Sequence, residues 1–208
     1  MRIAPDVLPP AFFPVGLNLV GRRCYVIGLA GDREANEKEA ALREVGADVT
    51  RISDVAGFAD ADVTDAFFVI STPQDDVLSA RLRALADAHK FLLCAIDQPV
   101  YGFVAMTAIV KAGPARIAIS TGGVSPRVGG LLRRALAGAL DATFARFMAC
   151  LALQRRRNRA RFAEADDRRQ AMVRAADGFA VDVCVTYPQW FLDELRAAGP
   201  QIVPREGT

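Results

Sequence analysis

A glycine pair joins an apolar segment to a basic helix in the stretch AISTGGVSPRVGGLLRRAL, residues 118–136. The two glycines would leave backbone N–H groups exposed, and Ser125 followed by Pro126 is typical of an N-cap and a first helical position. Exposed N–H groups at the start of a helix can hold an anion. The same residues could instead form a plain junction in the fold, and the stretch alone leaves both interpretations open.

A second turn that could bind an anion follows the apolar run Cys24 to Leu29. In dinucleotide-binding folds, glycines after the first strand let the backbone approach a pyrophosphate at the start of the next helix. The turn here contains Gly28, Leu29, Ala30, Gly31 and Asp32. It departs from GxGxxG, because Ala30 stands at the second glycine and Asp32 adds a negative charge. A nucleotide site and an ordinary tight turn are both compatible with this pattern.

Alternating strands and helices would position these turns. Strand patterns cover residues 24–29, 48–53, 66–72 and 91–97, and helical patterns cover 35–45 and 75–90. This alternation predicts an α/β fold with a Rossmann-like parallel sheet over residues 1–112. The turn Ala112-Gly113-Pro114 then predicts a small β-hairpin, followed by a helix, over 113–145. We expect residues 146–208 to form a helical C-terminal domain.

Composition limits the classes of function. The chain has 208 residues, of which 52% are hydrophobic, and a net charge of +2 from 26 basic and 24 acidic side chains. This near balance gives no general attraction to nucleic acid or to an anionic membrane surface. No apolar run approaches the roughly 20 residues that cross a bilayer. Because four prolines interrupt the apolar N-terminal segment, we expect no signal peptide and no membrane span, and therefore a cytoplasmic protein.

Residues that could hold a metal are sparse. The four cysteines lie far apart in the sequence, and His89 is the only histidine. Neither a CxxC motif nor a Cys/His cluster is present in the sequence. We therefore predict no resident metal site and no disulfide framework.

Four stretches occur together in a recognisable order. They are FPVGLNLVGRRCYVIG at residues 13–28, VISTPQDD at 69–76, LLCAIDQP at 92–99 and GPARIAISTGGVSPRVGGLLRRAL at 113–136. The last is the most specific, because a hairpin, Thr-Gly-Gly-x-Ser-Pro and Leu-Leu-Arg follow one another. Together they resemble the siroheme synthase N-terminal module family of precorrin-2 dehydrogenases and sirohydrochlorin ferrochelatases. The resemblance covers roughly residues 12–145.

This resemblance implies an oxidoreductase of siroheme (porphyrin) biosynthesis that uses NAD to convert precorrin-2 to sirohydrochlorin. It implies iron insertion as a possible second activity, with Fe²⁺ bound only transiently, and a homodimer formed through residues 113–145. Asp97, at the end of LLCAID, matches the carboxylate to which the family assigns the central acid–base role. From the residues alone, Asp97 would be interpreted as a cap at the end of a strand.

The resemblance also suggests two sets of binding residues. The NAD site would comprise Gly28, Leu29, Ala30, Gly31, Asp54 and Thr72. Asp54 could accept hydrogen bonds from a ribose diol, or it could be a solvated loop acid. The tetrapyrrole site would comprise Thr121, Gly122, Gly123, Ser125 and Arg127, with Arg133 as a second cation for substrate carboxylates.

Several positions depart from the family pattern. The glycine turn is about two residues longer, although Lys38 falls at a matching lysine, and the segment between Ile52 and Ala66 is short enough to lack a strand. Cys94 replaces an asparagine and Gln98 replaces a second acid. These departures motivate an alternative: a non-redox relative that binds or metalates a tetrapyrrole, or serves as a regulatory scaffold.

Two features of the C-terminal region have a functional and a plain interpretation. The arginines of residues 153–179 could bind substrate carboxylates, but a solvated helix face explains most of them, and few aromatic residues accompany them to indicate nucleic-acid binding. The aromatic cluster around Trp190 could stack on a macrocycle, although packing in a core or interface is the favoured interpretation.

Overall fold

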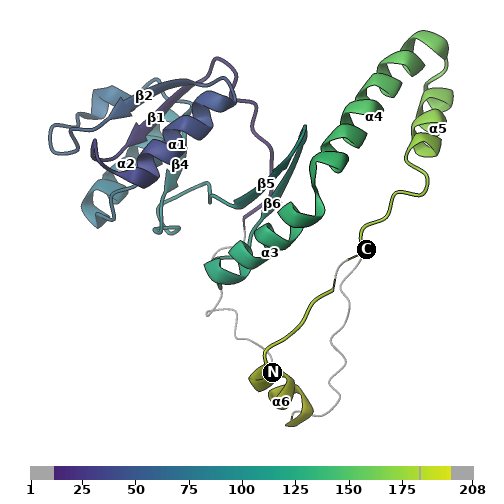
Figure 1. Cartoon of the computed structure of the whole chain (residues 1–208). Coiled ribbons are helices and arrows are strands. Elements are labelled where there is room, and N and C mark those ends of the chain that lie inside the picture. The colour runs from purple at the N-terminus through teal and green to yellow at the C-terminus, as the bar shows by residue number, and fades with distance from the viewer. Residues whose placement is uncertain (1–11, 183, 198–208) are drawn as a thin grey trace. The chain divides into compact units, whose positions relative to one another are not determined.

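A computed structural model describes residues 12–182 and 184–197 (Figure 1). The chain divides into two compact units, the first ending at Ala149 and the second beginning at Cys150. The first unit therefore contains both the Rossmann-like region and the hairpin region that the sequence predicts.

A parallel four-stranded sheet forms the centre of the first unit. Its strands and helices, in chain order, are β1 (Arg23–Ile27), α1 (Arg33–Glu44), β2 (Asp48–Ile52), β3 (Phe68–Ser71), α2 (Asp76–His89) and β4 (Leu92–Ala95). The strands lie in the order β2-β1-β3-β4, and every neighbouring pair is parallel. The predicted α/β class and the strand–helix alternation are confirmed. The strands are one to three residues shorter than predicted, because hydrogen-bonded pairing ends before the apolar sequence does.

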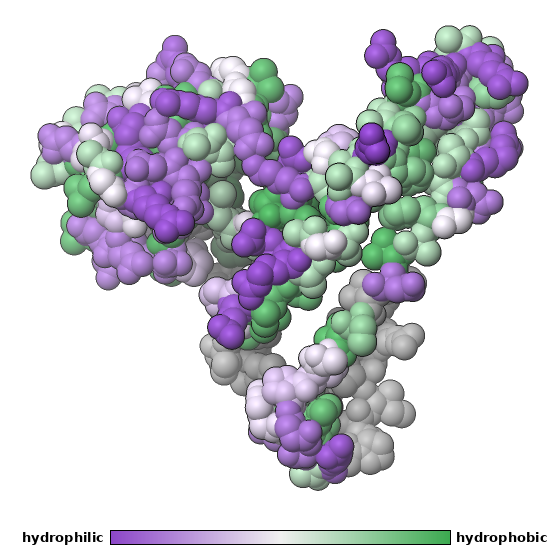
Figure 2. Space-filling view, in the orientation of Figure 1, coloured by the Kyte–Doolittle hydropathy of each residue, from purple (hydrophilic) through white to green (hydrophobic). Residues whose placement is uncertain are grey.

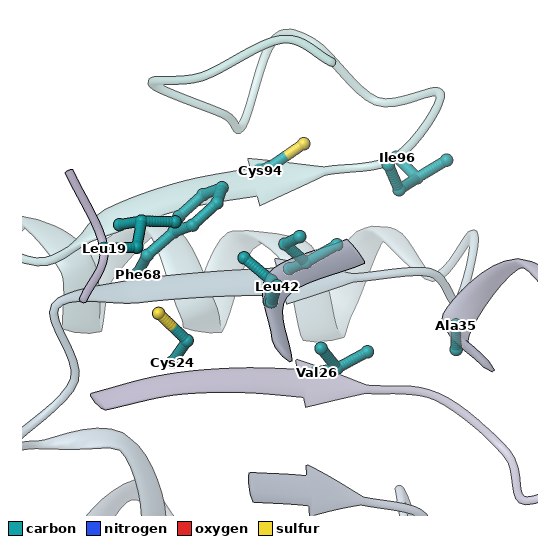
Figure 3. Packing of buried hydrophobic residues seen from close by; sticks show 9 residues of the cluster. Leu19, Cys24, Val26, Ala35, Leu42, Phe68, Cys94 and Ile96 are labelled. Carbon is teal, nitrogen blue, oxygen red and sulfur yellow. The ribbon is translucent and has the colours of Figure 1, made fainter. Parts of the chain in front are cut away.

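Two clusters of buried apolar side chains include residues of the sheet strands and of the helices beside it. The outer face of the sheet region that Figure 2 shows is largely hydrophilic. Neighbouring residues of a strand point to opposite faces. Val26 therefore belongs to the cluster that Ala35 and Leu42 of α1 complete (Figure 3). Ile27 belongs to the cluster with Leu82 and other residues of α2. This two-sided burial explains the continuous apolar runs of the strands and places the two helices on opposite faces.

The segment between β2 and β3 contains a short 3₁₀ helix, η2 (Asp60–Val63), and no strand among its described residues. Val63 is buried in the cluster beneath α2. The shortened connection thus still contributes to the core.

The predicted hairpin and the helix after it are also confirmed. Strands β5 (Ala108–Ala112) and β6 (Ala115–Ile119) pair antiparallel, and Gly113 at their turn has a positive φ of 56°. Helix α3 (Pro126–Ala139) begins after Ser125, whose side chain accepts a hydrogen bond from the Val128 amide at 3.3 Å. Residue Gly129 of α3 is buried, and the helix packs against both hairpin strands.

The C-terminal unit is helical over most of its described length, as predicted. Helix α4 (Ala142–Arg161) begins in the first unit, and α5 (Ala165–Ala175) and α6 (Gln189–Ala197) follow. Asn158 is buried between α4 and α5, where it accepts a hydrogen bond from Gln154 and donates one to the Met172 sulfur at 3.5 Å.

Within the described part of the chain, no single helix has the length and apolar composition of a membrane span. Helices α3 and α4, which meet at a bend of 69°, would satisfy both criteria only when taken together.

Candidate functional site

The strand order reverses at the carboxyl ends of β1 and β3. The chain leaves β1 toward β2 on one side, and β3 lies on the other side of β1. Ligands of open α/β sheets bind where the strand order reverses in this way. Gly28 follows β1 here, and Thr72 follows β3 with its amide bonded to the Ile27 carbonyl at 3.0 Å.

The glycine turn after β1 is closely packed at one end and open at the other. A Cβ at Gly28 would clash with the Thr72 hydroxyl and lie 3.0 Å from the Cβ of Ala35. A Cβ at Gly31 would meet nothing within 4 Å. Among the described residues, the amides of Gly31 and Arg33 have no hydrogen-bond acceptor. This end of the turn therefore fits the pyrophosphate of a dinucleotide, which needs open space and free N–H groups.

Asp32 is the N-cap of α1. Its carboxylate accepts hydrogen bonds from the amides of Glu34 and Ala35 at 2.9 and 3.3 Å, and from the Thr72 hydroxyl. The Thr72 hydrogen bond and these amides hold the pKa of Asp32 below its ordinary value. Asp32, the acid that the sequence places near the phosphate site, thus caps the start of α1.

Asp32→Ala should lower the free energy of unfolding by about 1 kcal/mol near neutral pH, because the N-cap is lost. A carboxylate with a lowered folded-state pKa stabilises the fold above its unfolded-state pKa, and this stabilisation disappears as the pH falls through the folded-state value. Urea denaturation at neutral pH and below about pH 3 should therefore show a difference from wild type that shrinks in acid. Asp32→Asn, which can still cap the helix, serves as the control. An unchanged difference in acid would contradict a role for the ionised carboxylate.

Arg51, near the end of β2, contacts the glycine turn. Arg51 donates hydrogen bonds to the carbonyls of Gly28 and Leu29 at 3.0 and 2.5 Å, and its guanidinium lies 3.6 Å from Glu39. Asp54, the predicted ribose acceptor, instead accepts the Gly57 amide within its own loop at 2.9 Å. The sequence interpretation missed Arg51; the only signal was a charged residue in the predicted strand.

A pocket of about 540 Å³ lies beside the carboxyl end of β4, within the first unit. We call it the strand-end pocket. Its walls come from α1, the end of β4, the segment that leads into β5, the end of β6 and the start of α3. The residues that line it include Phe12, Glu34, Lys38, Cys94, Asp97, Met106, Thr121, Gly122 and Gly123.

The strand-end pocket brings Asp97 together with Thr121, Gly122 and Gly123. The two glycines have positive φ values of 59° and 75°, which glycine adopts without steric cost. Three other groups of predicted site residues do not line the pocket. They are the glycine turn with Thr72 and Asp54, the N-cap residue Ser125, and the exposed Arg127. Glu34, Lys38 and Phe12 do line it, although the site prediction omitted them.

Asp97 is held at the pocket by an unusual backbone. Its φ is 57°, in the left-handed region that aspartate and asparagine tolerate better than most residues. The Gln74 side-chain amide donates to Asp97 Oδ2 at 3.2 Å. This geometry leaves a solvent-accessible carboxylate at the end of a buried strand.

Gln98, which stands where the resemblance leads us to expect a second acid, does not line the pocket. Its side-chain oxygen accepts from the Ser79 hydroxyl at 2.6 Å, and its nitrogen donates to Asp76 at 2.8 Å. Both partners belong to α2. Gln98 therefore anchors its loop to α2 and does not line the strand-end pocket.

Cys94, which stands where the resemblance leads us to expect an asparagine, lines the pocket from a buried position. Burial raises the pKa of its thiol to about 11. The thiol is therefore neutral near pH 7 and is neither an efficient nucleophile nor a ready metal ligand. Across the described residues, no group of three or more His, Cys, Asp or Glu side chains could hold a metal ion.

The chain is similar to known siroheme synthases. It is 30% identical over 186 residues to the siroheme synthase of Thioalkalivibrio sulfidiphilus. The aligned region covers 80% of this chain and 37% of that protein. It is 31% identical over 180 residues to the siroheme synthase of Xylella fastidiosa, covering 77% and 37%. These matches confirm the resemblance to the siroheme synthase N-terminal module family. No protein-family model matches it.

A solved structure shares the fold of this chain. SirC, a precorrin-2 dehydrogenase, superposes with a TM-score of 0.63 over 80% of this chain and 90% of its own, at 18% identity. The chain spans a little over a third of the siroheme synthases that it matches, at 37% of their length. The sequence matches thus support the family resemblance, and the superposition shows the fold.

Proposed function

We propose that this module catalyses the NAD-dependent oxidation of precorrin-2 to sirohydrochlorin. The observation that carries the proposal is the strand-end pocket, where Asp97 and the loop Thr121–Gly123 line one cavity. The relatives are siroheme synthases, and SirC, which shares the fold, is a precorrin-2 dehydrogenase. Both the cavity and the family support a tetrapyrrole substrate.

The residues around the glycine turn would hold the dinucleotide. The amides of Gly31 and Arg33 would donate to its pyrophosphate, and the close packing of Gly28 against Thr72 keeps the turn next to β1. Arg51 fixes the turn through the carbonyls of Gly28 and Leu29. When bound, NAD supplies the acceptor for the hydride that the oxidation removes.

The protein's own chemical contribution would come from Asp97. Oxidation of precorrin-2 removes a proton together with the hydride, and the Asp97 carboxylate lies at the pocket where it can take that proton. Gln74 orients this carboxylate from outside through its 3.2 Å hydrogen bond. The loop Thr121–Gly123 would support the macrocycle on the other wall of the pocket. Iron insertion would use the same carboxylate to accept pyrrole protons, with Fe²⁺ as a substrate.

A spectral turnover assay tests the proposal. Purified protein with precorrin-2 and NAD should give the absorbance spectrum of sirohydrochlorin, and omission of NAD should abolish the change. A parallel sample with sirohydrochlorin and Fe²⁺ tests iron insertion separately. If NAD neither binds nor supports any spectral change, the proposed dehydrogenase activity is wrong. Iron insertion in that sample would then favour the non-redox alternative.

We also propose that the module forms a homodimer through α3. Val128, Leu131 and Leu132 lie three to four residues apart on this helix and are 47%, 48% and 38% exposed, so they form an apolar stripe. Exposed stripes of this kind mark contact surfaces with other chains. The stripe lies in the region through which the family is expected to dimerise.

A further inference from the structure

The strand-end pocket has an uneven set of charges. The ionisable side chains among its lining residues are Glu34, Lys38, Asp97 and Cys94. The Cys94 thiol is neutral because burial raises its pKa to about 11. Among the described residues that line the pocket, Lys38 is the single cation, against the two carboxyl groups of Glu34 and Asp97.

Lys38 lies in the middle of α1 and forms part of the wall of the strand-end pocket. Its side chain is 21% exposed, and its ammonium group lies 3.3 Å from Glu34, one helical turn earlier. Such an i,i+4 pair contributes little to helix stability. A half-buried lysine at a cavity is therefore available to exchange its intrahelical partner for a ligand.

We propose that Lys38 binds a carboxylate of the substrate, and that Glu34 competes with the substrate for it. This inference rests on the proposed tetrapyrrole substrate, whose side chains are carboxylates. A lysine ammonium acts as a point charge and forms a charge-assisted hydrogen bond with such a group. The two residues thus set the affinity of the pocket for anionic substituents: Lys38 raises it by attraction, and Glu34 lowers it by pairing with Lys38.

The charges predict effects of opposite sign. Lys38→Met removes the cation and leaves two carboxylates facing an anionic ligand, so binding should weaken by about tenfold. Glu34→Gln removes a negative charge and frees Lys38, so binding should tighten by about threefold. If the pair were only structural, the two variants would change binding in the same direction or leave it unchanged.

Equilibrium titration with uroporphyrin, a stable porphyrin with eight carboxylates, measures this effect without turnover. The titration follows porphyrin absorbance for wild type, Lys38→Met, Glu34→Gln and Lys38→Arg, at low and high salt. Lys38→Arg keeps the charge and should retain most of the affinity. The Lys38→Met loss should be larger at low salt, because salt screens the missing attraction. Lys90→Met removes an exposed lysine outside the pocket and is the matched control.

The outcomes separate this inference from the proposed function. Opposite shifts for Lys38→Met and Glu34→Gln, with no shift for Lys90→Met, support the role of Lys38. Equal affinity of wild type and a folded Lys38→Met overturns it, even if wild type oxidises precorrin-2. Wild-type protein that binds no uroporphyrin and oxidises no precorrin-2 overturns both proposals.

Discussion

Asp97→Asn should lower kcat/KM for precorrin-2 oxidation by about a thousandfold, the scale that a positioned acid–base group contributes. Asparagine is the informative replacement because it also tolerates the left-handed backbone at this position, where φ is 57°. The variant should fold normally and keep the Gln74 side chain as a neighbour. Initial rates of sirohydrochlorin formation, measured over a range of precorrin-2 concentrations, provide the measurement.

The matched control for this variant is Asp87→Asn. Asp87 lies on the exposed surface of α2 and pairs with Arg83 at 3.0 Å, outside the strand-end pocket. Its replacement removes the same charge and should leave kcat/KM unchanged. Wild-type activity in a correctly folded Asp97→Asn would rule out Asp97 as the proton acceptor.

Leu131→Asp should convert the proposed homodimer to a monomer. Leu131 is 48% exposed in the single chain, so the replacement costs the monomer little packing. In a dimer it would bury an unpaired carboxylate in an apolar interface, which weakens association by several kcal/mol. Sedimentation velocity over a range of protein concentrations measures the change in molecular mass.

Ala137→Asp provides the control for this second variant. Ala137 is exposed on α3, and the helical period places it away from the apolar stripe. The same charge should therefore leave the dimer intact. A wild-type protein that sediments as a monomer at all concentrations would show that α3 is not a self-association surface.

The fold was predictable because its signals are local. The runs that form β1, β3 and β4 are apolar except for Arg23 at the start of β1 and Ser71 at the end of β3, since both sheet faces are covered. Ser125 and Pro126 mark the start of α3. The ends of the strands were not predictable to the residue. Apolar character continues past the last paired residue, as at Ile96, which is buried beyond β4.

The candidate site was predictable only in part. Asp97 and the loop Thr121–Gly123 came from the family resemblance, and the pocket brings them together. Lys38 and Glu34 share a helix face by their spacing, but spacing alone does not tell which face of α1 meets the pocket. Likewise, Gln98 in place of an expected acid suggested a weakened site. In the structure, Gln98 bonds to Ser79 and Asp76 of α2 and does not line the pocket. Side-chain direction at a strand end depends on tertiary neighbours that the sequence does not identify.

The hydrogen bond between Gln98 and Asp76 has an evolutionary consequence. The Asp76 carboxylate accepts a hydrogen bond from the side-chain amide of Gln98, with an N···O distance of 2.8 Å. An acid at position 98 would place a second carboxylate next to it. Like charges at this distance repel, so restoring the family's acid at this position alone would destabilise the start of α2. Substitutions at 76 and 98 should therefore be epistatic, and the two positions would change identity together in the course of divergence.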